Sequence, residues 1–339
     1  MAAAPVRRRR TNPSAAVSDR LPYGFGRYPR IVMSADITST PDGPLPAPRR
    51  PSRLPAPVRA LRPRQWMKNV LVLSAPLAAG SLFQTGVLSK SALAFVSFCL
   101  VSGAVYLIND IRDVEEDRLH PKKRFRPVPA GELAIPAAWI EAIVVGVVGL
   151  AIGYLTSIQL GITVTVYLLL QIGYSTFLKH QPIIDLAMVA SGFLLRAIAG
   201  GVASGIPLSQ WFLLVASFGS LFMVSGKRYS EMLELGADAG TRKSLASYTT
   251  SYLRFTWMLS AGMVLMSYSL WAFENLQRGP LGVGWTAISI APFTLGLLQY
   301  AREIDQGTAG EPEDVVLKDH VLLIFGALWL IVICVAVFG

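Results

Sequence analysis

One short stretch of this chain combines a ladder of carboxylates with a cluster of basic residues. It reads Asn-Asp-Ile-Arg-Asp-Val-Glu-Glu-Asp from Asn109 to Asp117, and residues 118–127 are strongly basic. If the preceding apolar segment continues as a helix, Asn109, Asp113 and Asp117 recur every four residues and share one face, with Asp110 close by. Carboxylates crowded in this way repel one another unless a cation holds them.

The residue types in this stretch suit Mg²⁺ and a diphosphate substrate. Mg²⁺ prefers oxygen ligands, usually takes one or two carboxylates, and completes its shell with water and substrate phosphates. The expected metal ligands are Asn109, Asp110, Asp113 and Asp117, and the three aspartates are also the expected catalytic residues. Basic side chains suit phosphates, and those expected to bind substrate here are Lys122, Arg124 and Arg126. The alternative is a charged loop that only fixes membrane topology.

Further polar side chains interrupt or end apolar segments elsewhere. The candidates for substrate binding are Lys68 and Asn69 near the start of the first segment, Tyr174 and Lys179 at the end of the fourth, and Lys227, Arg228 and Glu231 after the sixth. Each has a simpler explanation. A lysine at the end of a membrane span reaches the lipid headgroups, and a basic helix terminus fixes topology.

Arg196 lies in the middle of the apolar segment 183–203. It is about 16 Å along a helix from Asp185 at about 1.5 Å per residue. A charge at that depth is costly unless it faces a polar cavity or a partner, and the small residues around it allow close helix packing. We expect an arginine that lines a cavity and holds an anion, and a structural ion pair is the alternative.

Composition identifies a membrane protein. The 339 residues are 53% hydrophobic and 15% charged, with a mean hydropathy of +0.48, values typical of a chain with many membrane spans. Residues 1–65 carry 13 Arg and 3 Asp, whereas the remainder carries 18 basic and 18 acidic residues. The positive charge thus belongs to the N-terminal region, where it favours contact with anionic membrane lipids and not with nucleic acid.

Hydropathy predicts an all-α fold with nine transmembrane helices. The expected spans are 66–86, 91–111, 136–156, 159–178, 183–203, 209–226, 253–274, 283–302 and 318–338, each near the length that crosses a bilayer. The charged loops fall on one side, which the positive-inside rule makes cytoplasmic, with the N-terminus inside. Residues 1–60 are rich in Pro, Arg, Ala and Ser and are expected to form a disordered tail, and 61–339 the catalytic domain.

The motifs together resemble those of the UbiA superfamily of intramembrane prenyltransferases. Asn109–Asp117 matches the NDxxDxxxD motif of that family, and Arg64–Asn69 and Leu195–Gly200 resemble further family signatures. The resemblance implies a helical bundle around a central cavity that opens to lipid, a polar cytoplasmic cap, and Mg²⁺ as cofactor. The chain departs from the family where a second aspartate-rich motif is usual, because Gly226–Glu231 reads Gly-Lys-Arg-Tyr-Ser-Glu.

The combination of Asn109–Pro127, Tyr174–Lys179 and Gly226–Glu231 resembles one branch of the family, the actinobacterial phosphoribosyltransferases that act on decaprenyl phosphate. The resemblance implies phosphoribosyl diphosphate as donor, decaprenyl phosphate as acceptor, a plasma-membrane location with a cytoplasmic site, and a role in cell-wall arabinan synthesis. An aromatic prenyltransferase of quinone synthesis and a transporter are the alternatives, although charge concentrated on one side favours an enzyme over a transporter. A homo-oligomer is compatible with the sequence.

Overall fold

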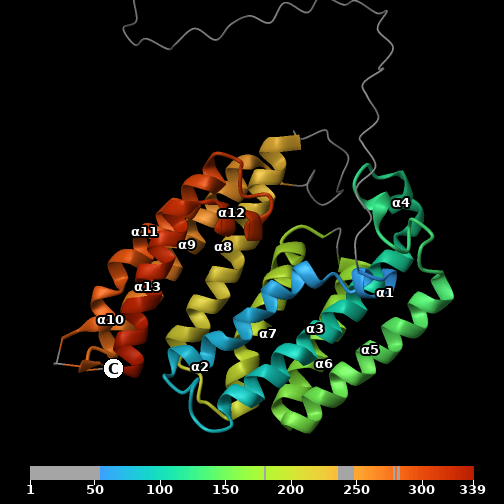
Figure 1. The fold of residues 1–339 in the computed structure, drawn as a ribbon. Coiled ribbons are helices and arrows are strands. Elements are labelled where there is room, and N and C mark those ends of the chain that lie inside the picture. The colour runs from blue at the N-terminus through green and yellow to red at the C-terminus, as the bar shows by residue number, and fades with distance from the viewer. Residues whose placement is uncertain (1–53, 179–180, 236–247, 278, 281–282) are drawn as a thin grey trace, which may run out of the picture. The chain divides into compact units, whose positions relative to one another are not determined.

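A computed structural model of the chain describes residues 54–178, 181–235, 248–277, 279–280 and 283–339. Within these ranges the regular secondary structure is entirely helical (Figure 1), as the composition predicts. Most of the expected tail lies outside the described residues. Its last part, however, forms the helix α1 (Ala56–Ala60), and Ala60 is buried. Residues 56–60 therefore belong to the folded domain and not to the tail.

The described chain contains eight long helices joined by short helical segments. The long helices are α3 (Val87–Arg112), α5 (Ile135–Thr156), α6 (Ile158–Gly173), α7 (Ile184–Ser204), α8 (Gln210–Leu235), α9 (Thr250–Glu274), α11 (Ile290–Asp305) and α13 (His320–Phe338). The short segments are the 3₁₀ helices η1 (Pro63–Leu73) and η2 (Lys123–Phe125), the π-helix η3 (Tyr174–Leu178), and α2 (Ser74–Ala78), α4 (Val114–Leu119), α10 (Trp285–Ile288) and α12 (Pro312–Lys318).

Five helices in the described part are long and apolar enough to cross a membrane, which makes the chain an integral membrane protein. They are α3, α5, α6 with its continuation to Thr176, α7 and α13. The helices α8, α9 and α11 overlap three further expected spans. The count of nine spans is not confirmed.

The first expected span, 66–86, is not one α-helix. Residues 63–73 form η1, the short helix α2 follows, and Gly80 ends it with a left-handed φ of 70°. The broken segment packs against α7 at Gly200, where an added Cβ would clash with the carbonyl oxygen of Val72. The close approach of η1 to α7 is thus possible only because residue 200 has no side chain.

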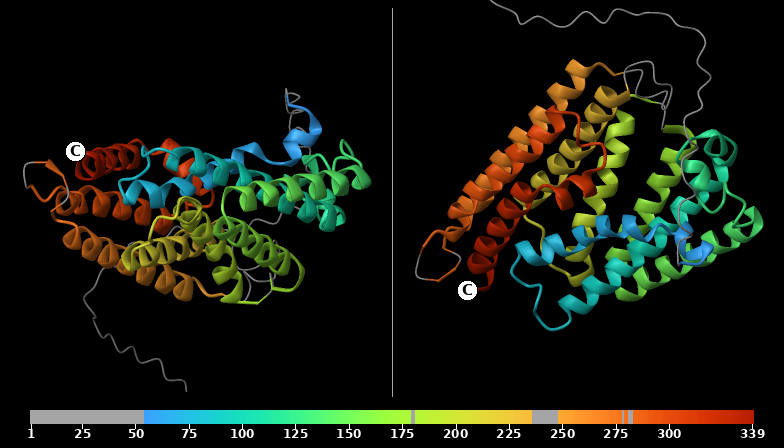
Figure 2. Two further views of the ribbon diagram at one scale, coloured as in Figure 1. Left: turned by 90° about the horizontal axis from the view of Figure 1, so that it is seen from below. Right: turned by 45° about the horizontal axis from the view of Figure 1, so that its top comes forward.

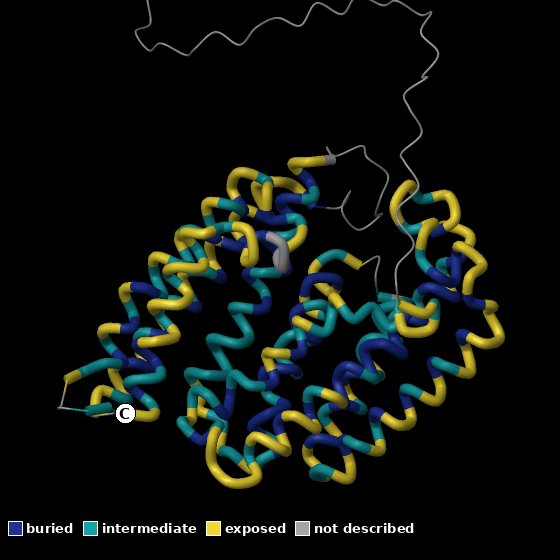
Figure 3. Tube along the Cα trace, in the orientation of Figure 1, coloured by how far each residue is buried: buried dark blue, intermediate teal, exposed yellow. Residues whose placement is uncertain are grey.

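The helix α7 occupies the centre of the bundle. It contacts α3, α6 and η1 on one side and α8 on the other. The helix α3 packs along α5, α8 along α9, and α11 along α13 (Figures 1 and 2). Outer helices alternate buried and exposed faces (Figure 3), and large apolar side chains such as Ile140, Ile143 and Val147 are at least 60% exposed on α5. Such a face suits lipid and not water.

Two expected loops contain regular structure that positions polar residues. The helix α8 continues to Leu235, so residues 227–235 are helical and not part of a loop. The segment between α3 and α5 contains α4 and η2. Both segments were expected to be loops because hydropathy falls where charged residues begin. The backbone can nevertheless remain helical beyond the membrane-spanning part.

Candidate active site

The acidic motif lies across a break between two helices. The helix α3 ends at Arg112, and Asp113 has a non-helical backbone that also begins α4. Helical spacing nevertheless continues, because the amide of Asp113 donates to the carbonyl of Asn109 at 2.9 Å and the amide of Asp117 donates to that of Asp113 at 2.8 Å. The motif therefore keeps the expected four-residue period through the break.

Basic residues from two other segments bind the two buried carboxylates of the motif. Asp110 and Asp117 are 1% and 2% exposed. Arg126 Nη1 lies 3.1 Å from Asp110 Oδ1 and 2.6 Å from Asp117 Oδ2, and Lys123 Nζ lies 3.4 Å from Asp117 Oδ1. Arg62, the residue before η1, donates to Asp110 Oδ1. We call these five residues the acidic-motif cluster.

Sequence reasoning anticipated only part of this cluster. It placed Arg126 on a substrate phosphate, whereas the structure pairs this residue with both carboxylates. It missed Arg62. This residue could have been suspected because it is a further basic residue, two positions before the Arg64–Asn69 signature. Lys122 and Arg124 are exposed, and Asn109 and Asp113 are partly exposed.

The expected set of four metal ligands is not gathered into one group. Among the described residues no three His, Cys, Asp or Glu side chains lie close enough together to hold a metal ion. The motif still suits Mg²⁺, because Asp110 Oδ2 is buried and has no hydrogen-bond partner. An open carboxylate oxygen next to a second carboxylate meets the usual protein contribution to a Mg²⁺ site that also uses substrate phosphates.

Two groups near the acidic motif have pKa values moved from their ordinary range. Burial, and then the charge of Lys123, lower the pKa of His120, whose Nδ1 accepts from the amide of Lys122 at 3.1 Å. A hydrogen bond from Arg59 lowers the pKa of Glu132, and the two side chains pair at 2.7 Å. At neutral pH His120 is thus uncharged and Glu132 ionised.

A second polar cluster joins α7 to α8 and to the end of α6. Asp185 is fully buried and accepts from Arg228 Nε at 3.1 Å, from Arg228 Nη2 at 3.2 Å and from the Tyr174 hydroxyl at 2.6 Å. Glu231 pairs with Arg228 at 3.0 Å and with Lys227 at 3.7 Å. These five residues form the α7–α8 cluster.

The α7–α8 cluster brings together four of the expected substrate-binding residues, Tyr174, Lys227, Arg228 and Glu231, and adds Asp185. Lys227, Arg228 and Glu231 share a helix face, as their spacing predicts. Sequence reasoning missed Asp185, although an acidic residue in the first turn of an apolar helix was a usable signal. Lys179 lies outside the described residues.

Arg196 is buried in a network of neutral groups. Its Nε donates to Asn69 Oδ1 at 2.7 Å, Nη1 to the carbonyl of Gly192 at 2.7 Å, and Nη2 to the Tyr167 hydroxyl at 2.8 Å. Asn69 in turn donates to Cys99 Sγ at 3.2 Å. The sequence favoured an anion as the partner, whereas the structure ties α7 to η1 and α6 through uncharged acceptors.

Arg196→Lys is expected to lower the free energy of unfolding by about 2 kcal/mol, because one ammonium cannot reach Asn69, Tyr167 and Gly192 together. Thermal unfolding in detergent measures this loss. A lysine variant of unchanged stability that binds an anionic ligand more weakly would instead support an anion-binding role.

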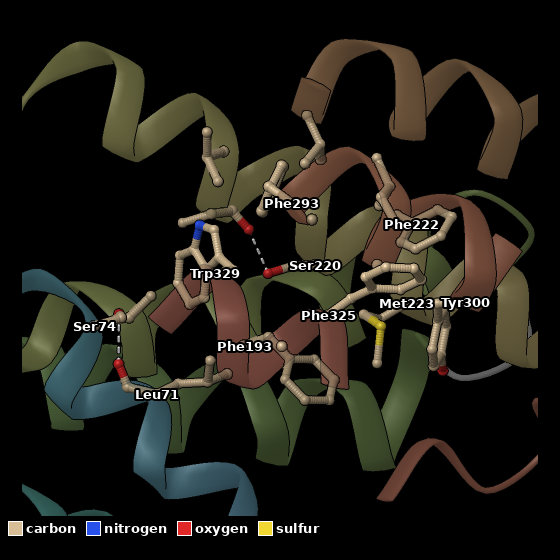
Figure 4. A pocket seen from close by; sticks show the side chains of 18 of the residues that line it. Leu71, Ser74, Phe193, Ser220, Phe222, Met223, Phe293, Tyr300, Phe325 and Trp329 are labelled. Carbon is tan, nitrogen blue, oxygen red and sulfur yellow. Dashed lines mark hydrogen bonds between the residues drawn. The ribbon is translucent and has the colours of Figure 1, made fainter. Parts of the chain in front are cut away.

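An apolar cavity of about 400 Å³ lies among η1, α7, α8, α11 and α13. Figure 4 shows aromatic and aliphatic side chains around it, and the labelled lining residues include Phe193, Phe222, Met223, Phe293, Tyr300, Phe325 and Trp329. The two serines among the lining residues hydrogen-bond to nearby backbone carbonyls: Ser74 Oγ donates to the carbonyl of Leu71 and Ser220 Oγ to that of Ala216, each at 2.6 Å. Arg196 is not among its lining residues.

The cavity and the polar clusters share the same helices. Met223 on α8 precedes Lys227 by four residues, about 6 Å along the axis at about 1.5 Å per residue. Leu71 of η1 and Ser74, the first residue of α2, line the cavity, and Arg62 of the acidic-motif cluster directly precedes η1. Of these charged residues, Lys227 thus lies about one helical turn beyond the cavity lining.

Membrane-length helices, two buried carboxylates paired with basic residues, and an apolar cavity define a helical membrane protein with a buried polar cluster beside its apolar core. The family model described as the UbiA prenyltransferase family matches residues 69–318, so the chain belongs to this family.

Curated relatives match most of the chain. A decaprenyl-phosphate phosphoribosyltransferase of Mycobacterium tuberculosis is 49% identical over 310 residues, covering 90% of this chain and 99% of that protein. Another, of Corynebacterium glutamicum, is 50% identical over 286 residues, covering 83% and 86%. Among solved structures, a UbiA homolog from Archaeoglobus fulgidus bound to GPP and Mg²⁺ superposes with a TM-score of 0.61 at 19% identity, covering 84% of this chain and 100% of that one, which supports the fold.

Proposed function

We propose that this protein transfers the 5-phosphoribosyl group of phosphoribosyl diphosphate to decaprenyl phosphate and releases pyrophosphate. The observation that carries the proposal is the identity of 49–50%, over most of both chains, to relatives named for this activity. The chemical features agree with a transferase whose acceptor is a lipid. Synthesis of cell-wall arabinan is the pathway that we propose for the product.

The donor is proposed to bind at the acidic-motif cluster. Asp110 and the neighbouring Asp117 would hold Mg²⁺ together with substrate phosphates, with Asn109 and Asp113 as the further proposed ligands, and the metal would neutralise charge on the leaving pyrophosphate. Lys122 and Arg124 are exposed beside the motif and are proposed to contact the donor phosphates. Arg126, which already bridges the two carboxylates, is suited to contact a phosphate at their edge.

The acceptor is proposed to place part of its chain in the apolar cavity. A decaprenyl chain is much larger than a cavity of about 400 Å³, so the remainder would lie in the bilayer. The lipid phosphate would then lie near Lys227, Glu231 and Tyr174 at one end of α8, with Lys68 and Lys179 as further candidate contacts. Asn69, Arg196 and Arg228 are proposed to support these residues, because their side chains bind internal partners.

The reaction requires little proton transfer from the protein. An oxygen of the lipid phosphate attacks the anomeric carbon, the bond from that carbon to the pyrophosphate oxygen breaks, and the pyrophosphate leaves with the electron pair. Phosphate oxygens are ionised at neutral pH, so no strong general base is needed. We therefore expect the protein to act by positioning the reactants and by stabilising charge.

The proposed location is the plasma membrane, with the active site and the N-terminus on the cytoplasmic side. The basic residues of the acidic-motif cluster and of the α7–α8 cluster support this orientation under the positive-inside rule. A soluble, charged donor is available on that side.

A transfer assay on purified protein tests the function. One reaction contains phosphoribosyl diphosphate with a polyprenyl phosphate, a second contains a prenyl diphosphate with an aromatic acid, and both are run with Mg²⁺ and with a chelator. We expect Mg²⁺-dependent appearance of phosphoribose in the lipid fraction of the first reaction. A prenylated aromatic product in the second, with none in the first, would show that donor and acceptor are reversed.

A further inference from the structure

Asp185 is the most completely buried acidic residue of the α7–α8 cluster, and it contacts side chains from two other helical segments. Its side chain has no exposed surface and accepts three hydrogen bonds. Two come from Arg228 of α8, and the third comes from the hydroxyl of Tyr174, where α6 becomes the π-helix η3. One carboxylate therefore sets the relative positions of η3, α7 and α8.

The burial of this pair is not explained by stability alone. A buried ion pair loses the hydration of both charges, and apolar residues of similar volume are often as stabilising. The guanidinium of Arg228 donates to Asp185 and to Glu231, which leaves no donor nitrogen without a partner. Arg228 therefore binds Asp185 and Glu231 and has no nitrogen left to bind a ligand.

The backbone on both sides of this contact is unusual. Tyr174–Leu178 form a π-helix, a feature often found at functional sites. Ile183, two residues before Asp185, has a φ of 67°, and its amide donates to the Tyr248 hydroxyl at 2.6 Å. A positive φ is costly for a β-branched residue and persists only where the surrounding structure enforces it.

Exposure increases along the contacts that begin at Asp185. The side chains of Asp185 and Arg228 are 0% and 4% exposed, whereas those of Glu231 and Lys227 are 21% and 29% exposed. The four charges alternate in sign and sum to zero. The accessible end of this series is Lys227, one helical turn from the cavity residue Met223.

We propose that Asp185 is a positioning residue for the transfer reaction. It holds Tyr174, and with it the start of η3, and through Arg228 and Glu231 it places Lys227, so that the Lys227 ammonium contacts a phosphate group of a substrate. This inference rests on the proposed function. The proposed function makes this the phosphate of the lipid acceptor, and separate KM values for the lipid and for the donor test that choice.

Two single variants and their combination separate positioning from folding. Asp185→Asn removes the fully buried one of the two carboxylates that pair with Arg228, and we expect a lower unfolding temperature and at least a tenfold loss of kcat/KM. Arg228→Gln leaves the buried carboxylate of Asp185 without its positive partner, and we expect the same fall in unfolding temperature and in kcat/KM. The double variant D185N/R228Q contains no unpaired buried charge, so we expect its unfolding temperature to return toward that of the wild type. Its kcat/KM is expected to remain at least tenfold low.

Recovery of both stability and activity in the double variant would overturn the proposal, since it would make the pair a structural ion pair only. Wild-type kinetics in Asp185→Asn would overturn it as well. Tyr174→Phe removes a single hydroxyl and is expected to fold normally. It should raise the KM for one phosphate substrate about fivefold, and unchanged KM values for both substrates would count against the proposal.

Asp305→Asn is the matched control. Asp305 also pairs with an arginine, Arg254, at 2.8 Å, but both side chains are more than half exposed. Its kinetics and unfolding temperature are expected to match those of the wild type. A wild-type protein without phosphoribosyl transfer would reject the proposed function and this inference together, whereas an active wild type with insensitive variants would reject the positioning role alone.

Discussion

Asp110→Asn is expected to reduce Mg²⁺-dependent transfer by a hundredfold or more, with the protein still folded. Asparagine keeps an oxygen for Arg62 but loses the charge and the open carboxylate oxygen Oδ2. A lost metal ligand that neutralises the leaving group removes several kcal/mol of transition-state stabilisation, and about 3 kcal/mol corresponds to more than a hundredfold in rate. Initial rates over a Mg²⁺ titration measure the effect, and the half-saturating Mg²⁺ concentration is expected to rise.

The folded state of this variant is checked by its elution and unfolding temperature in detergent. Asp305→Asn again serves as the control, because it removes a carboxylate of an exposed ion pair outside the acidic motif. An Asp110→Asn protein that retains turnover within a few fold of the wild type, with unchanged Mg²⁺ dependence, would remove Asp110 from the metal site.

Gly200→Ala is expected to destabilise the fold by about 3 kcal/mol or more. The added methyl group would meet the backbone oxygen of Val72 and lie 3.0 Å from Cδ of Pro76. A clash with backbone cannot be relieved by rotating a side chain, so η1 and α7 must separate. Their separation breaks the contact between Asn69 and Arg196, and we expect a fall in unfolding temperature together with a loss of transfer activity.

Gly262→Ala on α9 provides the comparison, because nothing lies within 4 Å of the position that its methyl group would take. Alanine favours helix over glycine by up to about 1 kcal/mol, so this variant is expected to be as stable as the wild type or slightly more so. Equal unfolding temperatures for the two variants would contradict the packing of η1 on α7.

Local properties of the chain were predictable from its sequence. Apolar runs as long as Ile135–Thr156 and His320–Phe338 form membrane-length helices whatever surrounds them, since a backbone in lipid must bond to itself. The acidic motif is equally local, because Asn109, Asp113 and Asp117 keep the four-residue period of a helical backbone over nine residues. The placement of Lys227, Arg228 and Glu231 on one helix face has the same origin.

The tertiary structure decided which charges pair and where the chain breaks its helices. Asp185 and Arg228 are 43 residues apart, and Arg196 and Asn69 are 127 apart; no local period connects them. Hydropathy predicted one continuous helix over the first span, residues 66–86. Packing of η1 against Gly200 instead divides this span into η1 and α2. The apolar cavity has the same dependence on packing, because its walls come from helices distant in sequence and exist only after those helices meet.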